Sequence, residues 1–188
     1  MSWTTELDAV NAMLAAIGEA PVESLTSDLP EAQKAQRALA TVSRETQSKG
    51  WNFNKETNFP LTPGVTGEIF IGTAILSLDP SNRNQDYVQR GPRLYDKKNH
   101  TYVFKSAVDC DLTLFLSFNE LPETARRFIT VRAARRFQKV ELSSGTLDRL
   151  SADEEDEAWI ALLHAESEST NANMFDDDPQ MRRTLRRS

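Results

Sequence analysis

The chain has 188 residues, of which 39% are hydrophobic and 27% are charged, and its formal net charge is −6. This length accommodates one or two domains with a buried core, and the negative charge excludes wholesale binding of nucleic acid through a basic surface. A single cysteine, Cys110, excludes an internal disulfide, and no apolar run is long enough to cross a membrane. The single cysteine fits synthesis in a reducing compartment, and the amino terminus lacks a basic-plus-apolar signal.

Two helices are predicted at the start of the chain. The first begins after Thr4 or Thr5, either of which can act as the N-cap, and it ends at Gly18. The second opens at Asp28, where Glu31 completes a capping-box arrangement. Apolar residues recur at helical spacing in both helices, and those of the second are mostly small, so a neighbouring helix can approach it closely.

The residues around Gly50 are the point about which the chain is organised. Gly50 is predicted to end the second helix, because glycine readily adopts the left-handed conformation of a helix end. Beyond it, Trp51 and Phe53 alternate with Asn52 and Asn54, a period-two pattern that places the aromatic rings on one side and the amides on the other. We interpret Gly50, Trp51 and Phe53 as a structural junction, with the rings as a plug between a helical layer and a sheet; a ligand-stacking site is the alternative.

Residues 55–119 have a sequence pattern typical of an antiparallel β domain. Short β-prone runs lie between glycine- and proline-containing turn signals. The predicted strands are residues 68–71, 75–78, 86–90, 93–95, 101–104 and 112–118. Residues 96–99, with the sequence Asp-Lys-Lys-Asn, are predicted to form a hairpin turn. We therefore expect an antiparallel sheet or a small barrel.

Helical patterns return after the β domain. A basic helix is predicted from Leu121 to about Leu142, and a second, strongly acidic at its start, opens at a capping box that begins with Ser151. The candidate interface residues of these helices are Arg132, Arg136, Glu155 and Glu166. We predict that Arg136 pairs with one of the two glutamates, either between the helices or across a subunit interface.

The last residues, 173–188, are polar and are predicted to form an extended C-terminal tail. Its four arginines are further candidate interface residues: Arg182, Arg183, Arg186 and Arg187. They form two pairs four positions apart, so they share one face if the segment becomes helical on contact.

Taken in order, these patterns predict an α+β fold. A helical bundle of about four helices comprises residues 1–54 and 120–172, an inserted antiparallel β domain comprises residues 55–119, and the tail comprises residues 173–188.

Signals of catalysis are weak. The sequence contains no phosphate-binding glycine loop, no metal-spaced cluster of histidine or cysteine, and no nucleophile elbow. The acidic residues 153–157 offer carboxylates of the kind that hydrolyse glycosides, but neighbours on one helix point in different directions and a solvated helix start explains them better. We therefore expect no enzyme, no cofactor and no metal site.

Four segments resemble the tail tubular protein A family of short-tailed bacteriophages. Residues 7–22 are similar to the opening of that family, and residues 47–54 contain a fairly specific Gly-Trp-x-Phe-Asn element that follows a helix. Residues 121–129 and 154–158 follow in the matching order, so that the resemblance extends over roughly residues 5–175.

This resemblance implies a virion structural protein. Members of the family form a twelve-subunit ring, the adaptor between the portal and the tail nozzle, with tail fibres attached near the adaptor–nozzle junction. Genomic DNA passes through the bore without specific binding, which suits a negative chain because like charges repel. The implied location is the virion tail, after synthesis in the host bacterial cytoplasm, with no membrane contact. We predict that the C-terminal arginines order against an acidic surface of the portal or of a neighbouring subunit.

A different class of function stays open from the residues alone. The protein could be a tail-associated capsular-glycan hydrolase or glycan-binding component. It would use Asp and Glu side chains together with exposed aromatic rings such as Trp51, Tyr87 or Tyr95.

Overall fold

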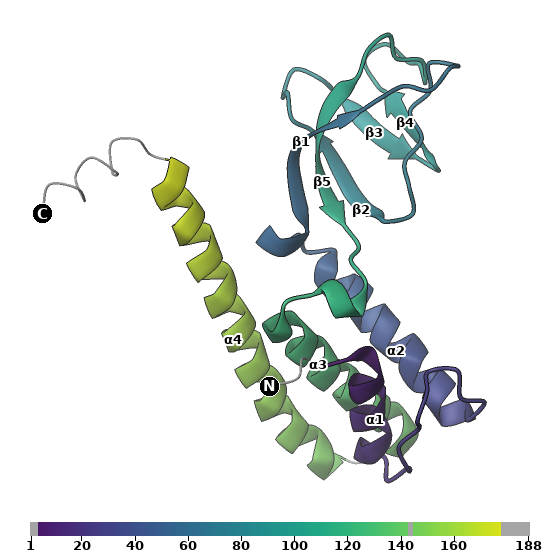
Figure 1. The fold of residues 1–188 in the computed structure, drawn as a ribbon, viewed down its shortest axis with the longest axis vertical. Coiled ribbons are helices and arrows are strands. Elements are labelled where there is room, and N and C mark those ends of the chain that lie inside the picture. Colours follow the sequence, from purple (N-terminus) through teal and green to yellow (C-terminus); the bar gives the residue numbers. More distant parts are fainter. Residues whose placement is uncertain (1–3, 143–144, 178–188) are drawn as a thin grey trace, which may run out of the picture. The chain divides into compact units, whose positions relative to one another are not determined.

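The structure is a computed structural model that describes residues 4–142 and 145–177, and it confirms the α+β class. The chain divides into two compact units (Figure 1). The helical unit is formed by the chain up to Thr46 and again from Ser117, and the β unit is formed by residues 47–116. These bounds lie somewhat before the predicted ones, so the aromatic stretch after Gly50 belongs to the β unit rather than to the helices.

The helices are α1 (Glu6–Ala16), α2 (Pro30–Gln47), α3 (Glu123–Leu142) and α4 (Gly145–Asp177). At the start of α1, Thr5 accepts a hydrogen bond from the backbone of Asp8, and the Asp8 carboxylate accepts one from the backbone of Thr5, so the predicted N-cap is confirmed.

The start of α4 differs from the prediction. The helix begins at Gly145, before the capping box at Ser151, and it continues into the segment predicted as tail. Residues 146–177 contain no glycine or proline, so no strong breaker interrupts the helix there.

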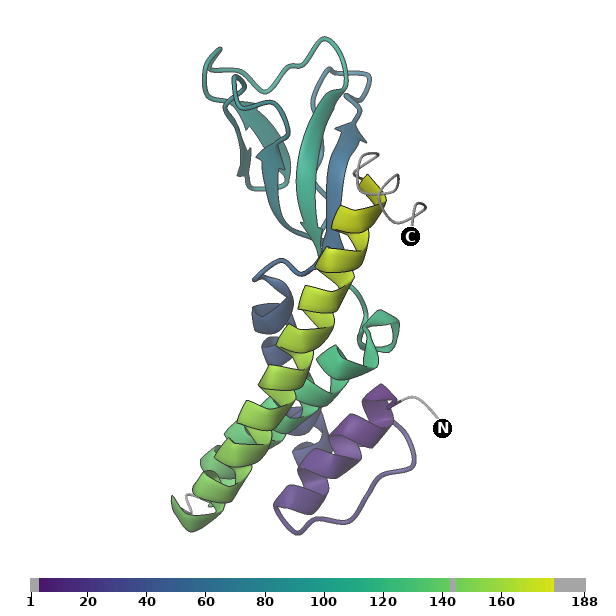
Figure 2. The same ribbon diagram turned by 90° about the vertical axis from the view of Figure 1, so that its left-hand side faces the viewer.

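In the helical unit, α3 packs against both α1 and α4 (Figures 1 and 2). At the α3–α4 contact the rings of Phe128 and Trp159 have centroids 5.0 Å apart. The largest fully buried side chains of this unit are Val10, Met13, Leu14, Leu39, Val42, Leu121, Phe128, Ile129 and Leu162. Val140 belongs to the apolar periodicity of α3 but is 76% exposed, so the buried stripe ends before it.

A buried arginine holds the start of α3 against the start of α1. The guanidinium of Arg126 donates to the carbonyl oxygens of Leu121 (2.7 Å), Thr4 (2.9 Å) and Asn119 (2.5 Å). The Glu123 carboxylate also accepts from the backbone N–H and the hydroxyl of Thr4. Arg126 is only 7% exposed, so it acts as a structural tie rather than as part of a basic surface.

The β unit contains a three-stranded antiparallel sheet in the order β1–β5–β2 and a separate hairpin, β3–β4. The strands are β1 (Lys55–Leu61), β2 (Ile75–Pro80), β3 (Tyr87–Arg90), β4 (Arg93–Asp96) and β5 (Val108–Leu114). Four of the predicted runs overlap β2, β3, β4 and β5. Residues 68–71 and 101–104 form isolated bridges rather than strands, and β1 was not among the predicted strands.

The core of the β unit lies between the sheet and the hairpin segments. Its buried members are Leu61, Ile69, Ile71, Leu94, Phe104, Val108, Cys110 and Leu112. Burial raises the pKa of the Cys110 thiol to about 11, which makes it an inert core residue. The predicted turn after β4 is confirmed: the buried Asp96 carboxylate accepts two hydrogen bonds of 2.8 Å from the backbone and side chain of Asn99.

Candidate assembly surfaces

Within residues 4–142 and 145–177 there is no group of three or more His, Cys, Asp or Glu side chains that could hold a metal ion. His100 and His164 lie in different units. Among the helices of that same part of the chain, none is long and apolar enough to cross a membrane. The surfaces described next are those that could take part in assembly.

The predicted structural junction begins as the sequence indicates. Gly50 follows α2 with a φ of 72°, and its N–H donates to the carbonyl oxygen of Gln47 at 3.0 Å. Beyond it the period-two expectation is wrong, because Asn52–Asn54 form a short 3-10 helix. Asn54 is therefore turned inward and is only 2% exposed, whereas the pattern had placed it with Asn52 on a polar side.

The Asn54 side chain joins three backbone groups. Its amide nitrogen donates to the carbonyl oxygens of Gln47 (3.0 Å) and Leu114 (2.7 Å), and its oxygen accepts from the N–H of Trp51 (2.8 Å). Gln47 makes a second link, since its amide donates to the carbonyl of Leu116 at 3.0 Å and accepts from the Leu116 N–H at 2.8 Å. The two amides thus bind together the segments by which the chain enters and leaves the β unit.

At the junction the Trp51 ring is buried and the Phe53 ring is half-buried. Trp51 is 5% exposed, and its ring lies parallel to that of Phe53 with the centroids 6.2 Å apart. A ring so deeply buried has no free face on which a ligand could stack. Of the other aromatics named for glycan binding, Tyr95 is 9% exposed beneath the Arg90 guanidinium, and Tyr87 packs edge-on against Phe104.

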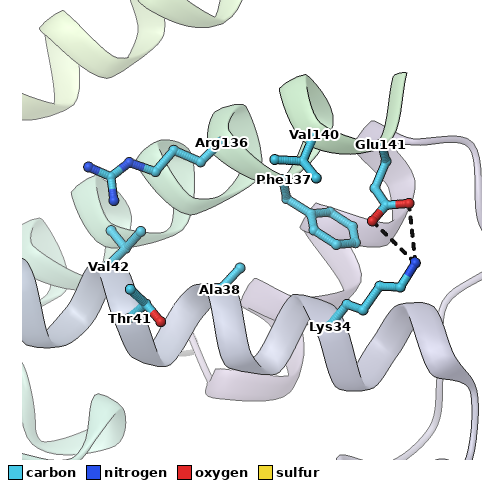
Figure 3. A pocket seen from close by; sticks show the side chains of 8 residues that line it. All are labelled: Lys34, Ala38, Thr41, Val42, Arg136, Phe137, Val140 and Glu141. Carbon is cyan, nitrogen blue, oxygen red and sulfur yellow. Dashed lines mark hydrogen bonds and ion pairs between the residues drawn. The ribbon is translucent and has the colours of Figure 1, made fainter. Parts of the chain in front are cut away.

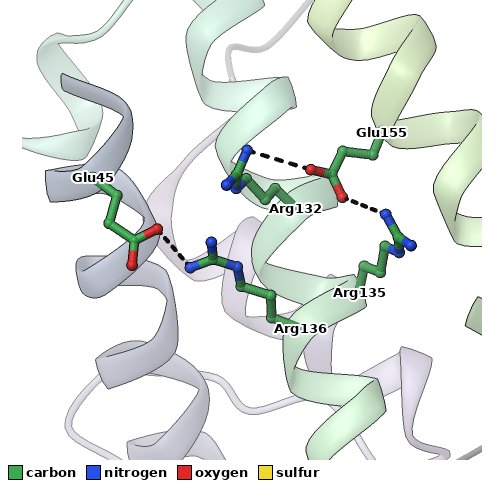
Figure 4. A network of polar contacts seen from close by, with 5 residues as sticks. All are labelled: Glu45, Arg132, Arg135, Arg136 and Glu155. Atoms are coloured by element: carbon green, nitrogen blue, oxygen red, sulfur yellow. Dashed lines mark hydrogen bonds and ion pairs between the residues drawn. The ribbon is translucent and has the colours of Figure 1, made fainter. Parts of the chain in front are cut away.

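Three arginines of α3 reach in two directions (Figure 4). Arg132 and Arg135 both contact the Glu155 carboxylate of α4, at 3.5 and 3.0 Å. Arg136 instead contacts Glu45 of α2 at 2.6 Å, so its predicted pairing with an acid of α4 is wrong within the chain. Neighbouring positions on a helix point about 100° apart, whereas positions three apart share a face, which explains why Arg136 turns away from Arg135.

The two ion-pair sites differ in burial. The Glu155 side chain is 16% exposed, and the Nε atom of Arg132 is buried without a hydrogen-bond partner. The Arg136 and Glu45 side chains are 43% and 47% exposed. Glu166, the remaining candidate of α4, is half-buried. The four C-terminal arginines lie outside the described residues.

A groove of about 460 Å³ lies between α2 and α3 (Figure 3). We call it the α2–α3 groove. Its lining residues are Lys34, Ala38, Thr41, Val42, Arg136, Phe137, Val140 and Glu141. Lys34 and Glu141 form an ion pair of 3.3 Å at one end, and Arg136 lies toward the other. The space between is apolar.

The exposed face of α4 carries a second apolar feature. Ile160 and Leu163 are 54% and 43% exposed, one helical turn apart. We call this pair, with the exposed acids Asp153, Asp156 and Glu157 that precede it, the α4 ridge. Single exposed apolar residues are ordinary, but two on one helix face are a candidate contact.

Comparisons with known proteins point in one direction. A family model described as tail tubular protein matches residues 7–172, a span that includes parts of both units. The chain is also 33% identical, over 124 residues, to the tail tubular protein A of Klebsiella phage KP34. The aligned part covers 66% of this chain and 66% of that protein, so the match spans just under two thirds of the relative's length.

Proposed function

Since the chain belongs to the tail tubular protein family and is thus a structural protein of a bacteriophage tail, we propose that it is the adaptor ring between the portal and the tail nozzle. Twelve copies surround a bore through which the genome leaves the head. The observation that carries this proposal is the family match over residues 7–172, because it extends across both compact units rather than over one motif.

The charge of the chain supports a channel role. A bore that binds DNA would retard ejection, and binding requires cations that neutralise phosphates. The net charge of −6 works against such binding. The C-terminal arginines supply the contact with an acidic surface of the portal or of a neighbouring subunit, and the tail fibres attach where the ring meets the nozzle.

We also propose that the protein is not an enzyme. Glu155, the middle acid of the candidate catalytic run, is bound by two arginines and serves α3–α4 packing. The acids beside it on the α4 ridge are exposed, as expected of a solvated helix start. Of the aromatic rings named as candidates for glycan binding, Trp51 and Tyr95 are buried and Tyr87 is half-buried.

The adaptor role is tested in phage that carry a nonsense codon in the gene for this protein. In a non-suppressing host we expect DNA-filled or leaking heads that have a portal but no nozzle and no fibres. Supplying the wild-type protein to these particles should restore the nozzle and infectivity. Cryo-electron microscopy of wild-type tails should show twelve copies between portal and nozzle. Complete nozzles on particles that lack the protein would refute the proposal.

The enzymatic alternative has its own assay. Purified protein is incubated with capsular polysaccharide, and the release of reducing ends is followed against a boiled control. We expect no release above the control. Sustained release that is lost in an Asp156→Asn variant would favour the glycan hydrolase instead.

A further inference from the structure

We propose that the α4 ridge of one subunit seats in the α2–α3 groove of the next. This inference rests on the proposed ring and names the contact that would close it. Both surfaces belong to the helical unit, and each presents exposed apolar side chains: Val140 in the groove, and Ile160 and Leu163 on the ridge.

The groove is suited to receive apolar side chains. Ala38 and Val42 line it from α2, and Phe137 and Val140 line it from α3. Val140 is 76% exposed although it continues the buried periodicity of its helix. An apolar side chain that continues the buried stripe of its helix but is exposed to solvent would be stabilised by a partner that covers it.

The ridge is suited to enter such a groove. Ala158 and Leu162 are 1% and 2% exposed and form the buried side of α4. At about 100° per residue, Ile160 and Leu163 point away from that side. The ridge is thus free of the packing that holds α4 in its own subunit, and its two side chains project one turn apart.

Charge favours the same pairing. On α2 the exposed Arg37 and Arg44 lie one helical turn before and after Thr41, which lines the groove. Lys34 and Arg136, toward its two ends, are paired with Glu141 and Glu45. The ridge carries Asp153, Asp156 and Glu157 ahead of its apolar pair. The arginines of α2 beside the groove and the acids of the ridge have opposite charge. This favours docking of the ridge into the groove and selects the direction in which α4 lies there.

The arrangement of the helices determines the kind of assembly. α3 lies between α2 and α4, as the side chains that reach from it show (Figure 4). The groove and the ridge are therefore different patches, and their contact is head-to-tail rather than the mutual contact of a two-fold dimer. Head-to-tail contacts build closed rings when the rotation per subunit closes.

Disulfide cross-linking in virions tests the contact. The variant Val140→Cys/Ile160→Cys is supplied to phage that lack the wild-type protein, and purified virions are mildly oxidised. The native Cys110 is fully buried and should not interfere. We expect a ladder of linked multimers from the double variant. Each single variant should stay monomeric, because the contact joins position 140 to position 160 and neither to itself.

The matched control is Val65→Cys/Ile160→Cys, since Val65 is a fully exposed valine of the β unit. This control should give no ladder. A ladder absent from the Val140→Cys/Ile160→Cys virions, in tails that contain the complete ring, overturns the inference and leaves the adaptor ring standing. Wild-type tails without a ring of this protein overturn the proposed function instead.

Aspartate substitutions give an independent readout. Val140→Asp and Ile160→Asp each place a charge at an exposed position that the contact would bury, so each should fold but lower the yield of infectious particles at least tenfold. Val65→Asp should leave the yield unchanged. Circular dichroism of the purified variants verifies that they fold. Wild-type yields from both ridge and groove variants would overturn the inference.

Discussion

The amide of Asn54 should be one of the most sensitive single side chains of the β unit. It is 2% exposed and bonds to the N–H of Trp51 and to the carbonyls of Gln47 and Leu114. In Asn54→Ala the N–H of Trp51 and the carbonyl of Leu114 lose the bond to Asn54, whereas the carbonyl of Gln47 still accepts from the N–H of Gly50. A buried group left unsatisfied costs about 1–3 kcal/mol, and water entering the space would relieve part of this. We expect the free energy of unfolding to fall by about 3–5 kcal/mol.

Asn54→Asp separates hydrogen bonding from shape. The carboxylate can still accept from Trp51, but it turns a negative charge toward the carbonyl oxygens of Gln47 and Leu114. Burial and these oxygens raise the pKa of the new carboxyl above its unfolded value of about 3.9. Its neutral form can donate one hydrogen bond, so the stability of the variant is greatest below the unfolded pKa and is lost as pH rises through the folded pKa.

The assay is urea unfolding followed by the fluorescence of Trp51, with Trp3 and Trp159 replaced by Phe. The deficit of each variant is measured against the parent at the same pH, so that the other carboxyl groups cancel. The deficit of Asn54→Asp should be smaller at about pH 5 than at about pH 8, and that of Asn54→Ala should not change with pH.

Asn84→Ala is the matched control, since Asn84 is an exposed asparagine of the same unit. Its effect should stay within about 0.5 kcal/mol. If Asn54→Ala costs less than about 1 kcal/mol, or if the Asn54→Asp deficit is constant with pH, the reasoning about this buried amide is refuted.

Three further predictions concern the β unit. Gly50→Ala should lower the free energy of unfolding by about 1–2 kcal/mol, because φ is 72° and the added Cβ would lie 2.7 Å from Cε of Lys55. Its control is Gly72→Ala, where the added Cβ would meet no atom within 4 Å. In the same urea titration this control should change stability by less than about 0.5 kcal/mol. Trp51→Ala should lower the free energy of unfolding by about 3–5 kcal/mol; an unchanged urea midpoint followed by circular dichroism would contradict its burial. Burial acts to raise the pKa of Asp96, but the hydrogen bonds from Asn99 outweigh burial and lower the pKa. The stability that this carboxylate contributes is therefore present above its unfolded pKa and is lost as pH falls through its folded pKa. The melting temperature of Asp96→Asn should thus fall less than that of the wild type between about pH 6 and pH 2.

The helices were predictable because their signals are local. The reciprocal bonds of Thr5 and Asp8 lie within one turn, and Gly50 ends α2 by its own backbone conformation. Sequence spacing within one helix is enough to recognise both features. What it could not indicate was the early start of α4, since a capping-box motif such as that at Ser151 can also lie inside a helix.

The β unit was harder to predict because its structure depends on distant partners. β1 has the sequence Lys-Glu-Thr-Asn-Phe-Pro-Leu, and six of its seven residues are exposed, so neither propensity nor burial marks it. It is a strand because β5 pairs with it. Likewise Asn54 is buried because Leu114, sixty positions away, offers a carbonyl to its amide.

The candidate interface shows the same limit. Sequence identified Arg132, Arg136 and Glu155 as charged residues near the apolar faces of α3 and α4. It could not show that Arg136 would form its ion pair with Glu45, which lies 91 positions earlier in the chain. A helical pattern indicates which way a side chain points but not which other element that side chain contacts.

The two glutamates that bind the arginines of α3 provide a direct test of what burial adds to an ion pair. Glu155→Gln and Glu45→Gln make the same chemical change. Glu155 is 16% exposed and serves Arg132 and Arg135, whereas Glu45 is 47% exposed and serves Arg136 alone. Exposed pairs contribute about 0–1 kcal/mol, and breaking a fully buried pair costs about 3–5 kcal/mol because the partner charge is stranded.

Glu155 lies between these limits but nearer the buried one, so Glu155→Gln should lower the free energy of unfolding by about 2–3 kcal/mol. Glu45→Gln should lower it by less than about 1 kcal/mol, and even that effect should shrink in about 1 M salt, where exposed charges are screened. Urea unfolding followed by circular dichroism at 222 nm, in low and high salt, measures both. Equal losses for the two variants would mean that burial does not decide the strength of these pairs, and the assignment of Arg132 and Arg135 to helix packing, rather than to a contact with another subunit, would then lose its physical basis.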